Sequence, residues 1–313
     1  MKTVFMYAGQ GSQKVSMGKD FYDEYKSFKY FIDRLDLSFD HKSIMFESGI
    51  EKLSETKYTQ PCMAAFAAGL TDLLSENGIK PDMSFGLSLG EYGALYASGV
   101  YDADTYVKIT QFRGQVMQDA AGSRKCAMSA ILKTDRNNIE KTIEEYDGEG
   151  YVIISNYNCP GQYVICGDET AVTNVEDTLR NRFNSKNVRL NVSGPFHTRF
   201  MAPAAKKMRD YYKNIQFNKP KINVAMNYTG KLLDEDEDIK ELLINQVKSP
   251  IKVEDDIITM LNNGAERFIE IGPGKVLSGF VKKTARVLDK TVDIISIESV
   301  SDFKNLVKGN SYE

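Results

Sequence analysis

The sequence is short of several residue types, and each shortage excludes a class of protein. Among its 313 residues there is no tryptophan, and only two histidines and four cysteines occur. The cysteines are scattered without a C-x-x-C pair, which argues against a zinc site and against a disulfide framework. We therefore expect a reduced, cytoplasmic protein that carries no metal and whose thiols are structural.

Long apolar runs are also missing, and the charge is nearly balanced. No apolar stretch approaches the length that crosses a membrane, and the short run at 4–8 is too brief for a signal peptide. A net charge of -3 argues against a nucleic acid bound through bulk electrostatics. The sequence thus predicts a globular protein with neither a membrane nor a nucleic-acid partner.

What the sequence does contain is a serine in the pattern G-x-S-x-G. Ser88 lies between Gly86 and Gly90, after a short apolar strand and before a helical stretch. A serine on a tight strand-to-helix turn is pushed out of the sheet with its hydroxyl exposed. The flanking glycines allow a sharp turn because they have no Cβ, and the N–H of Leu89 can face a developing oxyanion. Ser88 is a candidate nucleophile, and a glycine-rich turn with an incidental serine is the alternative.

The scarcity of histidine narrows the choice of a general base. A serine nucleophile near neutral pH needs a positioned base, and only His41 and His197 are available. His41 stands between Asp40 and Lys42, a polar setting that predicts exposure to solvent. His197 precedes a predicted helix and is the favoured base, with a structural hydrogen bond at the helix start as its alternative role.

The order of the predicted elements indicates an α/β fold with an inserted unit. Strands and helices alternate over most of the chain, which implies a mostly parallel sheet covered on both faces. After residue 125 the order becomes β-α-β-β-α-β, the pattern of a ferredoxin-like unit. We divide the chain into a large domain, residues 1–124 and 194–313, and a small domain, residues 125–193.

Local signals place several element boundaries. Aromatic residues at helical spacing predict one helix over 18–35. The tripeptide T-Q-P at 59–61 predicts a helix start, and Pro250 predicts another. The last strand of the inserted unit is expected over 187–192.

Five short motifs occur in one order along the chain. They are G-Q-G-S-Q at 9–13, G-L-S-L-G-E at 86–91, F-R-G at 112–114, P-F-H at 195–197 and G-P-G-K-V-L at 272–277. Together they resemble the acyltransferase family of fatty acid and polyketide synthesis, whose loading enzymes are malonyl-CoA:acyl carrier protein transacylases. The resemblance covers essentially the whole chain. It implies an α/β-hydrolase-like large domain and transfer of malonyl from malonyl-CoA to the phosphopantetheine thiol of acyl carrier protein through an acyl-serine.

The resemblance implies a role for each catalytic residue. Ser88 is the nucleophile and His197 the base. The histidine is oriented by a carbonyl at Gln246 instead of an acid, so the pair is a Ser-His dyad. The N–H groups of Gln10 and Leu89 form the oxyanion hole. For Gln246, an exposed polar residue on a helix is the alternative.

Substrate binding follows from the same resemblance. Arg113 holds the malonyl carboxylate in a bidentate ion pair, for which a planar guanidinium is suited, unless it is a surface arginine. Phe196 crowds the α-carbon of a branched donor. Acyl carrier protein and malonyl-CoA are the implied partners of a monomeric chain, with no cofactor. Three basic residues after the P-F-H motif are candidates for docking the carrier: Lys206, Lys207 and Arg209.

One departure from the family and two other functions remain open. Leu87 replaces the histidine that many members carry before the serine, which removes a hydrogen-bonding group beside the site. A serine hydrolase or thioesterase of the α/β-hydrolase type would place its histidine near the C-terminus and has no need of Arg113. A non-catalytic scaffold is the third reading, and the intact Ser88 and His197 argue against it.

Overall fold

Two β-sheets organise this computed structural model, which describes residues 1–122, 125–190 and 194–310. The strands are β1 (Thr3–Tyr7), β2 (Met83–Gly86), β3 (Cys126–Leu132), β4 (Val152–Cys159), β5 (Gln162–Asp168), β6 (Lys186–Arg189), β7 (Asn223–Met226), β8 (Lys231–Leu232), β9 (Ile251–Lys252), β10 (Arg267–Ile271) and β11 (Asp293–Ile297).

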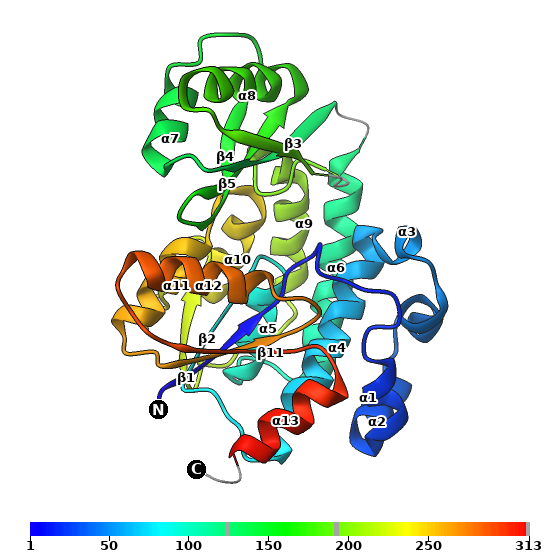
Figure 1. The fold of residues 1–313 in the computed structure, drawn as a ribbon. Coiled ribbons are helices and arrows are strands. Elements are labelled where there is room, and N and C mark those ends of the chain that lie inside the picture. The colour runs from blue at the N-terminus through cyan, green and yellow to red at the C-terminus, as the bar shows by residue number, and fades with distance from the viewer. Residues whose placement is uncertain (123–124, 191–193, 311–313) are drawn as a thin grey trace.

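Helices surround both sheets. They are α1 (Lys19–Glu24), α2 (Lys26–Arg34), η1 (Ser43–Glu47), α3 (Ile50–Leu53), α4 (Thr56–Glu76), α5 (Gly90–Ala97), α6 (Ala103–Ala121), α7 (Arg136–Glu144), α8 (Glu169–Phe183), η2 (Arg199–Met201), α9 (Ala202–Tyr212), α10 (Ile239–Lys248), α11 (Val253–Asn262), α12 (Val276–Val287) and α13 (Val300–Asn310). In Figure 1 the smaller sheet with α7 and α8 lies at one end of the molecule, and the labelled N and C ends lie at the other.

The larger sheet has the strand order β11-β10-β1-β2-β7-β8. Its first five strands pair in parallel, and the short β8 is antiparallel to β7. Along β1, Phe5 and Tyr7 join one buried cluster, whereas Val4 and Met6 join another. This two-residue alternation buries both faces of the sheet, so the predicted parallel sheet with two covered faces is confirmed.

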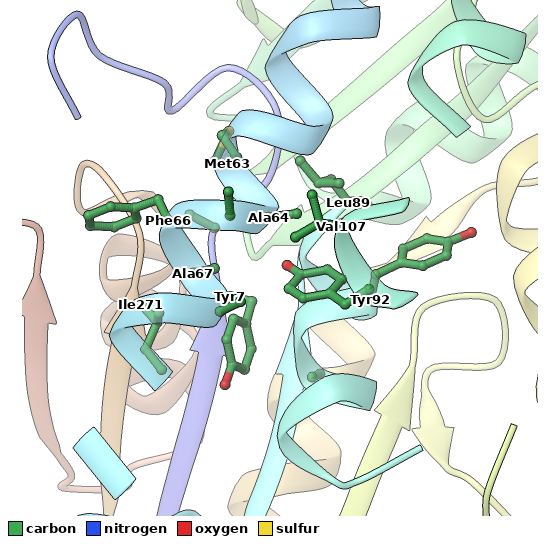
Figure 2. Packing of buried hydrophobic residues seen from close by; sticks show 14 of the residues in the cluster. Tyr7, Met63, Ala64, Phe66, Ala67, Leu89, Tyr92, Val107 and Ile271 are labelled. Atoms are coloured by element: carbon green, nitrogen blue, oxygen red, sulfur yellow. The ribbon is translucent and has the colours of Figure 1, made fainter. Parts of the chain in front are cut away.

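The α4 helix lies at the centre of the larger cluster. Figure 2 shows Met63, Ala64, Phe66 and Ala67 of α4 among side chains from both neighbouring strands and helices. The labelled partners are Tyr7, Leu89, Tyr92, Val107 and Ile271. Small residues on α4 bring the helix close to its neighbours, so the core packs directly against the turn that carries Ser88.

The smaller sheet has the order β6-β3-β5-β4-β9. Its first four strands pair antiparallel, in the arrangement expected for β-α-β-β-α-β, and α7 and α8 complete the unit. Part of the strand predicted over 187–192 lies outside the described residues, and the described part ends at Arg189. The prediction of a mostly parallel sheet plus a second, antiparallel unit is therefore confirmed.

The sequence did not predict β9. Helix α11 begins at Val253, three residues after Pro250, and the two residues between form a strand parallel to β4. A two-residue strand is too short for any periodic pattern to reveal. The division into residues 1–124 with 194–313 and residues 125–193 stays a proposal, because strand pairing does not define which segments fold as independent units.

Two helix boundaries also differ from the prediction. The expected helix over 18–35 is broken at Tyr25, which is extended while its ring packs on Phe21 and Phe303. Helix α4 begins at Thr56, so Pro61 lies inside the helix instead of at its start. The break at Tyr25 accompanies tertiary packing of its ring, which the local pattern does not show.

Candidate active site

Ser88 lies on a tight turn between β2 and α5. Its φ is 55°, in the left-handed region that a residue with a side chain rarely adopts. A Cβ on Gly86 would lie 2.0 Å from the carbonyl carbon of Gly90, and one on Gly90 would lie 2.0 Å from the oxygen of Tyr7. Only glycine fits at either position, so the predicted sharp turn is present and Ser88 is half-buried at its tip.

The Ser88 hydroxyl faces His197. Ser88 Oγ lies 2.7 Å from His197 Nε2, and His197 Nδ1 lies 2.8 Å from the carbonyl oxygen of Gln246. Because a carbonyl can only accept, Nδ1 carries the proton and Nε2 is left with a lone pair for the hydroxyl. This is the arrangement of a nucleophile with a base that a third group orients. His197 has a φ of 59° and is buried.

Arg113 reaches the same hydroxyl from α6. Its Nη2 donates to Ser88 Oγ at 3.1 Å and to Gln246 Oε1 at 3.0 Å, and its Nη1 donates to Gln60 Oε1 at 2.8 Å. The side chain is only 1% exposed, and its Nε has no hydrogen-bond partner within the described residues. Arg113 is therefore a buried cation beside the nucleophile and not a surface arginine.

The described part of the chain does not neutralise the charge of Arg113 with an ion pair. Within ion-pair distance of the guanidinium, the described part of the chain offers no carboxylate. The ring of Tyr92 lies under it, 5.2 Å from its centre. A buried cation without a carboxylate partner is costly, which makes this position suited to an anionic ligand.

The same environment also changes the pKa of His197. Burial and then the charge of Arg113 lower the pKa of His197 to about 3, against a smaller raising effect of the hydrogen bond to Gln246. His197 is thus neutral over the physiological range and free to accept a proton. A carboxylate that paired with Arg113 would remove one of the two effects that depress this pKa.

A buried network of polar residues contacts the turn that carries Ser88. Asn227, which follows β7, accepts from the Ser88 N–H at 2.7 Å and donates to Gly86 O and Asp256 Oδ2, both at 2.7 Å. The N–H of Asn227 donates to Glu91. Burial raises the pKa of Glu91 to about 8 and that of Asp256 well above its ordinary range. The network fixes the backbone of the turn that holds the nucleophile.

The predicted oxyanion donors are Gln10, just after β1, and Leu89, just after the nucleophile. Within the described residues neither backbone N–H donates to another group. Parallel strands place their carboxyl ends at one edge of a sheet, and β1 and β2 are neighbours. The two N–H groups are therefore available at the edge where Ser88 lies.

Two expectations about polar exposure are wrong. His41 is buried, and its Nε2 donates to the carbonyl of Ile32 at 2.8 Å. A flanking Asp and Lys point outward while the ring turns inward, which the sequence pattern does not show. Gln246 is also fully buried, so the reading as an exposed helix residue fails. Phe196 is buried next to His197.

The basic residues after the P-F-H motif are largely paired within the protein. Lys207 forms an ion pair with Asp119, and Arg209 forms one with Glu241. Lys206 is exposed. A lysine or arginine that already pairs with a carboxylate has less positive charge available to attract an acidic carrier protein. This helix face is therefore a weaker docking candidate than the sequence suggested.

Four residues of the site were not predicted from the sequence: Gln60, Glu91, Asn227 and Asp256. Asn227 had a usable signal, because a polar residue directly after a buried parallel strand lies at the ligand-binding edge of the sheet. Glu91 stood within a quoted motif but was read as part of the helix. Gln60 and Asp256 lie on helices far along the chain from Ser88, and no local pattern connects them to it.

The described residues contain neither a membrane-spanning helix nor a metal-binding cluster. None of the helices is long and apolar enough to cross a lipid bilayer. No cluster of three or more histidine, cysteine, aspartate or glutamate side chains is arranged to hold a metal ion.

Comparisons with known proteins agree with this geometry. A family model described as "Acyl transferase domain" matches residues 4–307. The malonyl CoA-acyl carrier protein transacylase of Bacillus subtilis is 36% identical over 302 residues, which cover 96% of this chain and 95% of the relative.

Solved structures give the same result. A malonyl CoA-acyl carrier protein transacylase from Clostridium perfringens superposes with a TM-score of 0.94 at 35% identity, covering 100% of this chain and 98% of the other. A malonyl-transacylase solved in complex with a type II PKS acyl-carrier protein has a TM-score of 0.92 at 28% identity, covering 99% and 100%. Both similarities extend over the whole chain.

Proposed function

This chain belongs to the acyl transferase domain family, and from that premise we propose that it transfers a malonyl group from malonyl-CoA to an acyl carrier protein. The full-length relatives that carry this activity in their names support the donor and the acceptor. The observation in the chain itself that carries the proposal is Arg113, a buried cation without a carboxylate partner within the described residues, 3.1 Å from the Ser88 hydroxyl.

The first half-reaction loads the serine. His197 Nε2 takes the proton of Ser88 Oγ, and the oxygen attacks the thioester carbonyl of malonyl-CoA. The N–H groups of Gln10 and Leu89 stabilise the oxyanion of the tetrahedral intermediate. When the carbon–sulfur bond breaks, the imidazolium of His197 gives its proton to the sulfur. CoA then leaves as a free thiol, and the malonyl group remains on Ser88 as an ester.

The second half-reaction runs the same steps with a different thiol. His197 takes the proton of the phosphopantetheine thiol on the carrier, and the sulfur attacks the ester carbonyl. The bond to Ser88 Oγ then breaks, and the proton passes from His197 to the serine oxygen. The Gln246 carbonyl keeps Nδ1 protonated in both directions, so no acidic third residue is required.

Arg113 and Phe196 select the donor. The malonyl carboxylate pairs with the guanidinium, whereas acetyl-CoA leaves the buried charge unpaired, which costs binding energy. Phe196, buried beside His197, crowds the α-carbon of a methylmalonyl group. Malonyl-CoA is accordingly the preferred donor over both acetyl-CoA and methylmalonyl-CoA.

The test compares malonyl-CoA turnover with and without a purified acyl carrier protein. A transferase releases CoA rapidly only when the carrier is present, and the malonyl group appears on the carrier by mass spectrometry. Release of free malonate at the same rate without a carrier would instead identify a hydrolase. A cytoplasmic location and a monomeric chain complete the proposal, and both are testable, by fractionation and by light scattering.

A further inference from the structure

Gln246 occupies a position between the substrate clamp and a buried acid. Its Oε1 accepts from Arg113 Nη2 at 3.0 Å. Its Nε2 donates to the Ser88 carbonyl at 2.7 Å and to Glu91 Oε2 at 2.8 Å. Both Gln246 and Glu91 are completely buried, so water cannot replace any of these contacts.

The chemistry of the neighbours allows only one orientation of the amide. If the amide of Gln246 turned over, its NH₂ would meet the N–H donors of Arg113, and its oxygen would meet a carbonyl and a carboxyl oxygen. The contact with Arg113 would then be donor against donor and the contact with the Ser88 carbonyl would be acceptor against acceptor, which is costly for buried groups. Arg113 and the Ser88 carbonyl thus fix the orientation of the amide, and Glu91 Oε2, which accepts from the same NH₂, fixes its position.

Glu91 is itself held in place. Its Oε1 accepts from the backbone N–H of Asn227, and a backbone N–H cannot rotate away. We propose that Glu91 is a positioning residue that acts through Gln246 to aim the Arg113 guanidinium, and so sets the preference for a donor that carries a carboxylate. The inference rests on the proposed malonyl transfer and deepens it.

Replacing Glu91 by glutamine tests the chain of contacts. The new side chain has one oxygen, which stays with the Asn227 N–H, so its NH₂ faces the NH₂ of Gln246. Arg113 and the Ser88 carbonyl still hold the Gln246 amide in its orientation, so the two NH₂ groups repel each other and the Gln246 side chain shifts relative to Arg113. For Glu91→Gln we expect the ratio of kcat/KM for malonyl-CoA to kcat/KM for acetyl-CoA to fall about tenfold or more.

A matched control is available on β10. Glu270 is also fully buried, and its carboxylate accepts from the N–H groups of Leu277 at 2.9 Å and Ser278 at 2.8 Å. Glu270→Gln makes the same chemical change without touching Arg113 or Gln246. It should lower the melting temperature but leave the malonyl-to-acetyl ratio of kcat/KM at the wild-type value.

A double variant keeps the test decisive if Glu91→Gln does not fold. In Glu91→Gln/Gln246→Glu the new amide donates to the new carboxylate, the carboxylate still accepts from Arg113, and the Ser88 carbonyl loses its donor. The double variant should show no malonyl preference, because Arg113 then has a carboxylate partner within the protein.

The outcomes separate this inference from the proposed function. If wild type shows no preference for malonyl-CoA over acetyl-CoA, the proposed function fails. If wild type prefers malonyl-CoA and Glu91→Gln keeps the same ratio, the positioning role of Glu91 is overturned. A double variant that keeps the malonyl preference would overturn it as well.

Discussion

Arg113 and His197 meet at one atom, the hydroxyl oxygen of Ser88. Arg113 Nη2 donates to that oxygen at 3.1 Å, and the oxygen lies 2.7 Å from His197 Nε2. Arg113, the proposed partner of the substrate carboxylate, and His197, the proposed base, therefore interact electrostatically. Protonation of His197 puts a second positive charge beside Arg113, and a bound malonyl carboxylate offsets it.

The pH dependence of acylation follows from this arrangement. Burial and Arg113 lower the pKa of His197 to about 3, from an ordinary value of about 6.5. We expect kcat/KM for Ser88 acylation to stay level as the pH falls from 7 to 5, measured by stopped-flow release of CoA. A decline of kcat/KM centred near pH 6.5 would show that the pKa of His197 is not lowered in the free enzyme.

The free energy of unfolding should also depend on the protonation of His197, and it should decrease as the pH falls. Because folding lowers the pKa of His197, its contribution to stability is full above about 6.5 and is lost as the pH falls toward 3. In denaturant titrations His197→Gln, which cannot be protonated, should lose less stability than wild type between pH 6.5 and 4. Equal losses in both proteins would contradict the lowered pKa.

Ser88→Ala should abolish acyl-enzyme formation, because the covalent route needs that oxygen. Wild type incubated with malonyl-CoA should gain the mass of one malonyl group, on the peptide that contains Ser88. Burial raises the thiol pKa of Cys62, Cys159 and Cys166, which keeps these thiols protonated and unreactive. Label on a cysteine would contradict the mechanism.

The two histidines should respond differently to replacement by alanine. His197→Ala should lower acylation by several orders of magnitude, by analogy with loss of the base of a catalytic triad. His41→Ala removes a buried hydrogen bond to Ile32 and should lower the melting temperature with little effect on kcat. Equal loss of kcat in the two variants would refute His197 as the base.

Arg113→Ala should change donor choice. Malonyl transfer should fall relative to acetyl transfer by roughly a hundredfold. The malonyl carboxylate loses its partner, and the binding of acetyl-CoA no longer leaves a buried positive charge unpaired. The measurement is kcat/KM for both thioesters. Arg199→Ala, an exposed arginine near His197 that stacks on Tyr151, serves as control and should leave the ratio unchanged. An unchanged ratio in Arg113→Ala would refute the clamp.

Phe196→Ala should admit a branched donor. Removing the ring should raise kcat/KM for methylmalonyl-CoA relative to malonyl-CoA by about tenfold, the scale of one methyl group in a pocket. Phe200→Ala removes a neighbouring ring that packs on Tyr151 instead and should not alter the ratio. If both variants behave alike, Phe196 does not set the size limit.

The sequence was most informative where chemistry is local. The glycines around Ser88 and the alternation of strands and helices are consequences of neighbouring residues, and both agree with the structure. The buried face of His41 and the break at Tyr25 depend on side chains that arrive from elsewhere in the chain. Asn227 and Glu91 meet Ser88 only after folding, so their partners cannot be read from spacing.

The short strand β9 lies between the small sheet and the residue whose carbonyl orients His197. It pairs with β4 of the small sheet, and it follows α10 within a few residues of Gln246, whose carbonyl orients His197. The chain from Gln246 to β9 is therefore shared by the pairing of the small sheet and by the hydrogen bond that orients His197, so a change in one bears on the other.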